Sequence, residues 1–398
     1  MNQASNSWLN KPVNLNSFAS IGSAVLIAGV VPIVLMVAPV LVDALMSGYH
    51  FTGPQGGSII TTELGGMALA TIPGLLWANR PIWRIMGLLS LVLMAVMYFL
   101  SAFSLTPETL PILRFISGLA GGTVMSVILA TISQSNNPDR NFGWWLVSQL
   151  VIGAIGLAII PRLMSNFGLQ GYYIFMGLVS IALLIPALNL PIGSPNLGSN
   201  INSTKPSSSF KIMALAGITM LGILCFCIGL NGTWIFMGQI GAGVGLTEIN
   251  VGDTLSTASL FGILGAVSAT FLGGRVGRLL PILFGIGLLI AALMFMHNAH
   301  GVTPYAVAAF MFKYSWTFTF PYLLAALSTI DRTGKLLVIA NIVIGGGMSI
   351  GPMISGNMLG SGSSYTAITV MAMTAMTAAG VFLLPIWLRK KAAGEGEL

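Results

Sequence analysis

GSPNLGSNINSTKPSSS, residues 193–209, decides how the chain is divided. The stretch is rich in Ser, Asn, Pro and Gly and has no apolar periodicity, so it predicts a linker. Six apolar runs lie on each side of it, and each has roughly the 20 residues that an α-helix needs to cross a bilayer core. The sequence therefore predicts an all-α polytopic membrane protein with twelve transmembrane helices. The predicted spans are 20–46, 56–77, 84–104, 110–134, 142–165, 171–190, 211–239, 250–273, 280–297, 303–329, 336–359 and 365–388.

This division predicts two pseudo-symmetric halves of six helices each. The N-terminal half covers 1–192, a cytoplasmic linker covers 193–210, and the C-terminal half covers 211–398. Two pairs of signals recur at matching places in the halves. GLLWANRPIWR (74–84) corresponds to LGGRVGRLL (272–280), and NPDRNFG (137–143) corresponds to TIDRTGK (329–335). Paired signals of this kind indicate a duplicated fold.

The composition excludes an ordinary soluble domain. The chain has 398 residues, of which 55% are hydrophobic and 6% charged, whereas a soluble domain carries about 25% charged residues. The 49 glycines and 22 methionines fit closely packed membrane helices. Cys225 and Cys227 are two residues apart on one predicted helix, so they face different sides and predict neither a disulfide nor a metal pair. Residues 1–19 are polar, and we expect no signal peptide.

The cations predict the orientation in the membrane. With both termini inside, 13 of the 16 Lys and Arg residues fall in inner connections or tails, while Glu108, Glu248 and the three histidines fall outside. The formal charge of +7 therefore indicates lipid orientation and no nucleic-acid partner. We expect an integral plasma (inner) membrane protein, a monomer, with N- and C-termini cytoplasmic. The inner cations are Lys11, Arg80, Arg84, Arg140, Lys205, Lys211, Arg275, Arg278, Arg332, Lys335, Arg389, Lys390 and Lys391.

These motifs resemble those of the major facilitator superfamily, and the resemblance covers the whole chain. The loop after the eighth span matches the family pattern G-x-x-x-D-R-x-G-R-R through Gly273, Arg275 and Gly277, followed by Arg278, although Gly274 replaces the acid. The fourth span matches R-x-x-x-G-x-x-x-G, and the arginine of that motif is linked in the family to packing and proton coupling. The matching residues are Arg114, Gly118 and Gly122. The resemblance implies a secondary transporter of the major facilitator fold and identifies no subfamily.

Charges inside spans are the candidates for function, because each costs about 3 kcal/mol or more near the bilayer centre without a partner or a wet cavity. Arg114, Asp43 and Glu63 share the outer part of the first half, where Glu63 lies roughly 10 Å deep at 1.5 Å per residue. A carboxylate and a guanidinium there can exchange partners: when the acid binds a proton, the arginine is freed for an anion. We predict Glu63 and Asp43 as proton-coupling residues. A static ion pair, with Asp43 as a solvated helix end, is the alternative.

Lys313 is the candidate in the second half. In FKYSWTFTFPY (312–322), Lys313, Trp316, Thr317 and Phe320 share one helix face. An ammonium with aromatic rings on one face can bind an organic anion, although an aromatic packing stripe with a snorkelling lysine is the alternative. Polar residues of the seventh span could add hydrogen bonds to a ligand. The predicted substrate-binding residues are Lys313, Arg114, Trp316, Thr317, Phe320, Trp234, Gln239 and Asn231.

We therefore expect a secondary active transporter of a small organic solute, an organic anion that bears a carboxylate and has an aromatic part. Its partners would be this solute, protons moved in symport, and the lipid bilayer. A proton-coupled drug or metabolite efflux antiporter is the alternative, and a non-transporting membrane receptor is a further one. The chain has no HExxH and no phosphate-binding glycine motif, so we expect no enzyme, no metal and no cofactor.

Overall fold

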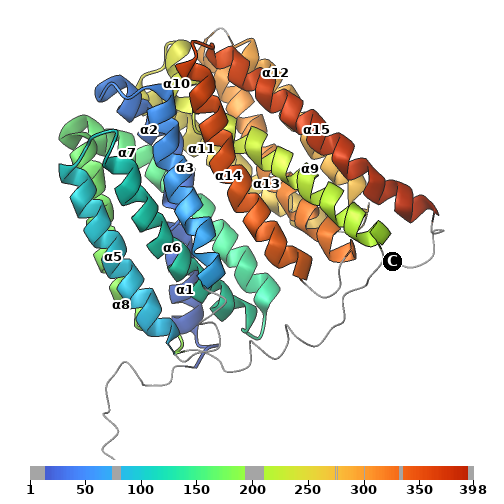
Figure 1. Ribbon diagram of the computed structural model, residues 1–398, viewed down its shortest axis with the longest axis horizontal. Helices are drawn as coiled ribbons and strands as arrows, with labels where there is room; N and C mark the ends of the chain where they lie inside the picture. The colour runs from blue at the N-terminus through green and yellow to red at the C-terminus, as the bar shows by residue number, and fades with distance from the viewer. Residues whose placement is uncertain are drawn as a thin grey trace, which may run out of the picture. The chain divides into compact units, whose positions relative to one another are not determined.

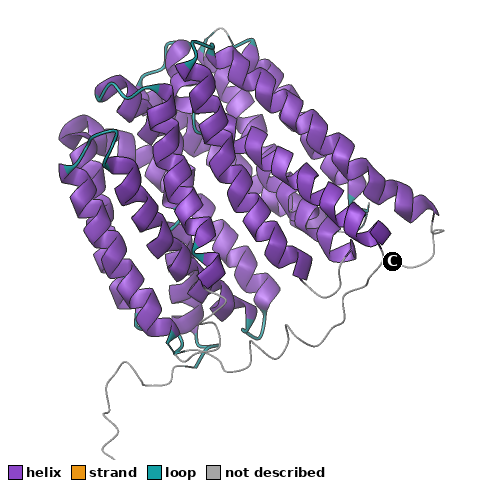
Figure 2. Ribbon diagram, in the orientation of Figure 1, coloured by secondary structure: helices purple, strands orange, loops and turns teal. Residues whose placement is uncertain are grey.

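The computed structural model describes residues 14–73, 82–192, 210–273, 275, 277–299, 301–330 and 335–392. The described elements are helices joined by short loops (Figure 1, Figure 2). They are α1 (Phe18–Val30), α2 (Ile33–Gly48), α3 (Gly53–Leu69), α5 (Trp83–Phe103), α6 (Leu110–Ser133), α7 (Pro138–Ala182), α8 (Leu184–Ala187), α9 (Phe210–Trp234), α10 (Met237–Gly243), α11 (Glu248–Leu272), α12 (Leu279–His297), α13 (Val302–Ile330), α14 (Lys335–Gly360) and α15 (Tyr365–Ala392).

The all-α polytopic fold is confirmed, and the predicted spans fall on these helices. Among the described residues, nine helical stretches are long and apolar enough to cross a membrane. The twelve predicted spans correspond to only nine such stretches for three reasons. The stretch 140–187 contains two predicted spans, α3 ends at Leu69 after only 17 residues, and α13 has a lysine and several hydroxyl side chains that reduce its hydropathy.

Three helices depart from the predicted boundaries. The first predicted span is interrupted between Val30 and Ile33, because Pro32 cannot donate a backbone N–H to the preceding turn. The seventh is interrupted at Ile235 and Phe236, so α10 is a separate short helix. The fifth and sixth spans form one long α7 that bends at Gly168, whose φ of 65° suits a residue without a Cβ atom.

Helix ends follow ordinary capping chemistry. The Ser17 side chain accepts a hydrogen bond from the backbone N–H of Ser20 at the start of α1. Thr247 caps α11 in the same way through the N–H of Asn250. Glu248 in the first turn of α11 adds a negative charge at the positive end of the helix dipole. Local sequence therefore fixes where both helices begin.

Charged side chains lie inside the helix packing, and apolar ones face outward. Asp43, Glu63, Arg114 and Lys313 are each at most 3% exposed. On α11, by contrast, the outward side chains are large and apolar: Leu260, Leu264, Val267 and Phe271. This inverted arrangement suits a lipid environment, where an apolar exterior is favourable and interior charges have specific partners.

The chain forms two compact units. Unit 1 consists of Met1–Met36, Thr62–Gly156 and Arg162–Ser203, and unit 2 consists of Val37–Thr61, Leu157–Pro161 and Thr204–Leu398. In unit 1, α6 packs against α5 and α1; in unit 2, α9 packs against α14 and α15, and α13 against α11 and α12. The predicted division into 1–192 and 211–398 stays a prediction, since the linker stretch 193–209 lies outside the described residues.

Candidate functional site

Helices α3 and α6 of unit 1 approach each other closely at glycines. A Cβ atom at Gly118 would collide with the backbone oxygen of Glu63, and one at Gly122 with that of Met67. In the other direction, a Cβ atom at Gly66 would lie 2.5 Å from a backbone oxygen of α6. Larger side chains at these positions would hold the two helices apart. The predicted R-x-x-x-G-x-x-x-G motif is therefore the surface of α6 that receives α3.

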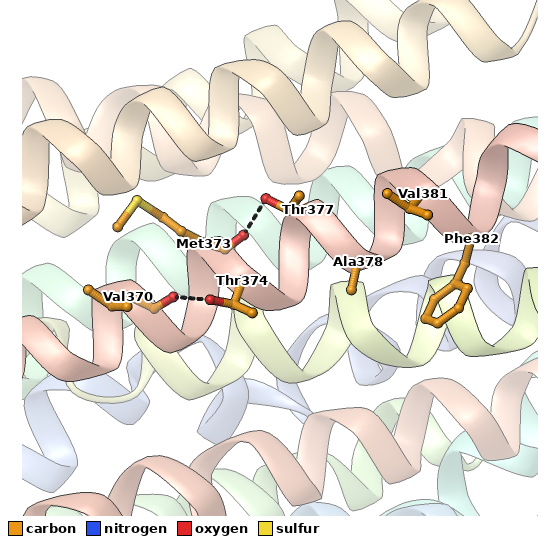
Figure 3. Close-up of a pocket in the computed structure, with 7 residues that line it drawn as sticks. All are labelled: Val370, Met373, Thr374, Thr377, Ala378, Val381 and Phe382. Atoms are coloured by element: carbon orange, nitrogen blue, oxygen red, sulfur yellow. Dashed lines mark hydrogen bonds between the residues drawn. The ribbon is translucent and has the colours of Figure 1, made fainter.

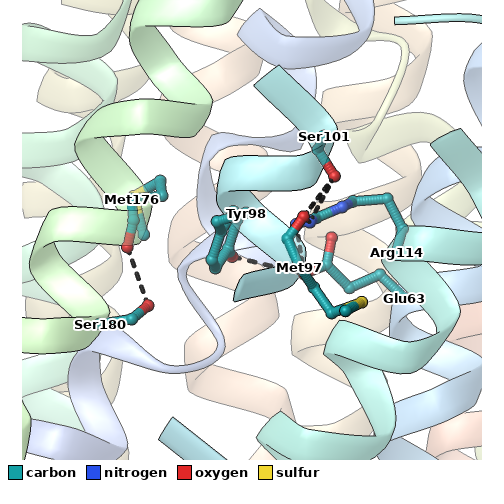
Figure 4. Close-up of polar contacts among 7 residues, drawn as sticks. All are labelled: Glu63, Met97, Tyr98, Ser101, Arg114, Met176 and Ser180. Carbon is teal, nitrogen blue, oxygen red and sulfur yellow. Dashed lines mark hydrogen bonds and ion pairs between the residues drawn. The ribbon is translucent and has the colours of Figure 1, made fainter. Parts of the chain in front are cut away.

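This close approach puts Arg114 of α6 beside Glu63 of α3 (Figure 4). Arg114 Nη1 lies 3.6 Å from Glu63 Oε1. Arg114 Nη2 also donates to α5, to the carbonyl oxygen of Met97 at 2.9 Å and to Ser101 Oγ at 2.7 Å. Arg114 is 0% exposed and Glu63 3%. Two residues predicted from sequence thus form one buried ion pair, in which each charge depends on the other.

Tyrosines surround the arginine of this pair. The Arg114 guanidinium carbon lies 4.3 Å from the ring centroid of Tyr98 and 5.1 Å from that of Tyr173. The Tyr98 hydroxyl also donates to Glu63 Oε1 at 3.4 Å. A buried cation over an aromatic ring gains about 0.5–2 kcal/mol. The positive charge of Arg114 is therefore held by aromatic faces and by α5 as well as by Glu63.

Lys313 of α13 lies in unit 2 and is 0% exposed. Its Nζ is 3.8 Å from the ring centroid of Trp234 and 4.2 Å from that of Trp316. The two indole rings are 5.8 Å apart and inclined at 70°. Trp234 ends α9, and Trp316 follows Lys313 by one turn of α13. Three predicted residues from two helices thus form one cluster, with the ammonium against two indole faces.

The remaining predicted residues around Lys313 differ in what they contact. Thr317 donates to the carbonyl oxygen of Gly262 at 2.6 Å, which ties α13 to α11. Phe320, one turn further, is half-buried. Asn231, one turn before Trp234, is fully buried and donates to the carbonyl oxygen of Cys227 at 3.1 Å. Its Oδ1 has no hydrogen-bond partner among the described residues, so an acceptor remains available on this helix.

Gln239 and Asp43 lie together in unit 2. Gln239 Nε2 donates to Asp43 Oδ1 at 2.5 Å, and Gln239 Oε1 accepts from the hydroxyl of Tyr365 at 2.8 Å. The break between α9 and α10 separates Gln239 from the helix that carries Asn231 and Trp234. The helical spacing assumed from the sequence therefore ends at the break, and both polar ends of the Gln239 amide contact other residues.

One pocket lies along α15 (Figure 3). Its lining residues come from this single helix, and its two hydroxyl groups are engaged within the helix. Thr374 donates to the carbonyl oxygen of Val370 at 3.0 Å, and Thr377 to that of Met373 at 2.8 Å. A groove on one apolar helix face is the surface that a membrane helix offers to lipid tails. It provides no group that would orient a polar solute.

Sequence reasoning missed the tyrosines. Tyr98 and Tyr173 contact Arg114, and Tyr365 contacts Gln239. Tyrosine in an apolar run carries no periodic signal, and the three residues are far from their partners in the sequence. The available signal was the hydroxyl itself, because a buried Tyr O–H usually finds a partner.

Comparisons with known proteins give a family and a shared fold. A family model described as Major Facilitator Superfamily matches residues 17–352. The structure of the nucleoside transporter NupG is similar, with a TM-score of 0.71 at 12% identity over 95% of this chain and 99% of that one. That of a D-xylose-proton symporter has a TM-score of 0.72 at 14% identity over 92% of this chain and 98% of that one. The comparison with curated proteins finds no matching sequence.

Apolar helices with buried charges, in a fold shared with transporters, define an integral membrane transport protein. The chain belongs to the Major Facilitator Superfamily. The predicted family and fold class are confirmed, and the protein is a transporter of the secondary type. Its substrate, its coupling ion and the roles of the site residues are matters for proposal.

Proposed function

We propose that the protein transports a small organic anion together with protons. The observation that carries this proposal is the position of Lys313, a lysine at the middle of an apolar helix with its ammonium against Trp234 and Trp316. A carboxylate on the solute would pair with the ammonium, and the indole rings would contact a flat or apolar part of the same molecule. Asn231, Thr317 and Phe320 would complete this binding region.

Glu63 and Arg114 supply the proposed proton coupling. While Glu63 is ionised, it compensates the charge of Arg114; when Glu63 takes up a proton, the guanidinium loses that compensation and favours another anion. Arg114 Nε and Nη1 make no hydrogen bond to a described residue, so these two donors can receive one. Uptake of a proton and of an anionic group would then favour each other.

Tyr98 and Tyr173 explain how the arginine stays in place during this exchange. Their rings and the two acceptors on α5 hold the guanidinium whether or not Glu63 is charged. The proton can therefore be exchanged without a large movement of Arg114. A structural neighbour named as a proton symporter supports protons as the coupling ion.

The same proposal places the protein in the inner membrane as a monomer, with both termini cytoplasmic. The distribution of cations supports this orientation, because 13 of the 16 Lys and Arg residues fall on one predicted side. The proposed coupling is symport, in which the solute and protons cross the membrane in the same direction.

A ligand screen tests the substrate class. Purified protein is heated with organic anions, neutral sugars and nucleosides, or lipophilic cations, and a ligand that binds the folded state raises the apparent melting temperature. At a ligand concentration of about 100 Kd the gain is about 2.7 kcal/mol. We expect hits among carboxylate-bearing aromatic compounds, and we expect Lys313→Gln to abolish the shift. Hits confined to neutral solutes or to cations would overturn the proposal.

A further inference from the structure

Two hydrogen bonds link Asp43, Gln239 and Tyr365, which lie on three different helices of unit 2. Asp43 comes from α2, Gln239 from α10, and Tyr365 begins α15. The Tyr365 hydroxyl donates to Gln239 Oε1 at 2.8 Å, and Gln239 Nε2 donates to Asp43 Oδ1 at 2.5 Å. Because an amide has one donor end and one acceptor end, Tyr365 fixes the orientation in which Gln239 offers its NH₂ group to Asp43.

The backbones of α10 and α2 are in close contact beside these hydrogen bonds. A Cβ atom at Gly238 would collide with the carbonyl oxygen of Pro39 and would lie 2.9 Å from the Cβ of Asp43. Glycine at 238 therefore lets α10 reach α2 at the position where Gln239 meets the carboxylate. The sequence neighbours Gly238 and Gln239 thus serve the same contact, one by its absence of a side chain and the other by its amide.

A second contact of the same kind joins the start of α3 to the end of α14. A Cβ atom at Gly57 would lie 2.7 Å from the carbonyl oxygen of Pro352, and one at Gly356 would lie 2.7 Å from that of Gly53. Thr61 donates to the carbonyl oxygen of Ser349 at 2.9 Å. At Gly57 and Gly356 backbone faces backbone, while the side chain of Leu359 packs over Gly53 and the ring of Pro54 packs over Gly360. Small residues at such a contact let the two backbones approach closely.

The ionisable neighbours of Asp43 are acidic or phenolic. Among the described residues they are Glu248 at the start of α11, Tyr305 on α13 and Tyr365 on α15. The Ser47 hydroxyl lies 2.6 Å from the carbonyl oxygen of Asp43 and 3.1 Å from Glu248 Oε1. The Gln239 N–H is thus the charge-assisted donor that the structure records on the Asp43 carboxylate, and such bonds are about twice as strong as neutral ones.

We infer that Asp43, Gln239 and Tyr365 are a latch, which holds the end of α2 and the start of α3 against α10, α14 and α15. Transport requires the release of this latch. A transporter of this superfamily exposes its site to each side of the membrane in turn by moving one helix set against another. The latched contacts join residues before the stretch 193–209 to residues after it, and glycines bring the backbones close together beside them. Gln239 and Tyr365 are then positioning residues for the transport cycle, and the inference does not depend on which solute is carried.

Distance measurement between two spin labels tests the latch without a substrate. Thr52→Cys and Ser361→Cys carry the labels, because both positions are exposed and flank the α3 and α14 contact; Cys225 and Cys227 are replaced by alanine. In this parent protein we expect a dominant short distance. Gln239→Leu removes both hydrogen bonds, and it should raise the ratio of long to short distances about tenfold, as expected for loss of a hydrogen bond to a charged group. Tyr365→Phe should produce a smaller increase.

A reciprocal exchange keeps the test meaningful if Gln239→Leu folds poorly. At mildly alkaline pH, Gln239→Glu places two carboxylates against each other and should open the contact. Adding Asp43→Asn to this variant restores a pair of one amide and one carboxylate, with the roles exchanged, and should close the contact again. Tyr305→Phe is the matched control: it loses a buried hydrogen bond to the carbonyl oxygen of Met237, between α13 and α10. An unchanged distance distribution in Gln239→Leu and Gln239→Glu, or an equal increase in Tyr305→Phe, would overturn the inference.

Discussion

Arg114 Nη1 and Glu63 Oε1 lie 3.6 Å apart inside unit 1, where neither residue is more than 3% exposed. The pair exists because Gly118 lets α3 approach α6 at the residue that carries the carboxylate. At 3.6 Å the contact is longer than a charge-assisted hydrogen bond, which is typically about 2.7–2.9 Å. Arg114 forms its shorter bonds with α5. We therefore propose that the carboxylate is the partner that leaves while the arginine stays.

Neutralising the acid should uncouple transport from protons. Glu63→Gln keeps the size of the side chain but cannot exchange a proton at neutral pH, so accumulation driven by a proton gradient should be lost while ligand binding or exchange is largely retained. Uptake into proteoliposomes with and without a gradient measures this. If active accumulation survives in Glu63→Gln, the acid is structural.

The contact between α3 and α6 should be intolerant of a single methyl group. Gly118→Ala introduces a Cβ atom against the backbone of Glu63, and overpacking of this kind typically costs about 1–3 kcal/mol. Thermal unfolding in detergent should show a lower melting temperature. Gly143→Ala is the matched control, because it is also helical and has nothing within 4 Å of the added atom; it should be neutral or slightly stabilising. Equal effects of both substitutions would show that the motif glycine is not a contact residue.

The ring of Tyr98 should matter more for stability than its hydroxyl. Tyr98→Phe keeps an aromatic face against Arg114 and loses only the 3.4 Å bond to Glu63, whereas Tyr98→Leu loses both. We expect Tyr98→Leu to be less stable than Tyr98→Phe by about 0.5–2 kcal/mol, the range of a buried cation–π contact. Thermal unfolding is measured for both variants and for the same variants combined with Arg114→Leu, in which the cation is absent. The comparison isolates the contribution of the cation–π contact to stability. A difference that persists without the arginine would assign the effect to packing.

The proposed topology places the stretch 193–209 inside the cell. A cysteine introduced there should resist an impermeant maleimide added to intact cells and should react once the membrane is opened. Ser361→Cys, exposed in the loop between α14 and α15 and predicted to lie outside, is the positive control. Efficient labelling of 193–209 from outside would reverse the whole orientation.

Sequence patterns predicted the fold well because apolar runs of membrane-spanning length are a strong physical signal. They could not predict the break at Ile235 and Phe236, where no proline marks the interruption. Gln239 was therefore assigned to the face of Trp234, although it lies on another helix. The cluster of Lys313 with Trp234 joins residues 79 positions apart, and only the single-helix part of it, Lys313 with Trp316, could be derived from spacing.

Substitution of Lys313 should distinguish anion binding from packing. Direct pairing predicts a large affinity loss in Lys313→Gln and partial retention in Lys313→Arg, because arginine keeps the charge and can also stack on indole rings. The loss should grow with the charge of the ligand, as measured by titration calorimetry with the solute identified by the screen. Normal binding by both variants would leave Lys313 with a structural role.

Accumulation in proteoliposomes under an inward proton gradient tests the central claim most directly. A pool of organic anions, neutral sugars and nucleosides, and lipophilic cations is supplied outside, and the trapped solutes are identified by mass spectrometry. We predict that carboxylate-bearing solutes accumulate, that collapse of the gradient abolishes the accumulation, and that Glu63→Gln and Lys313→Gln each prevent it. Accumulation of a neutral or cationic solute instead, or of an anion at an undiminished level without the gradient, would contradict the account.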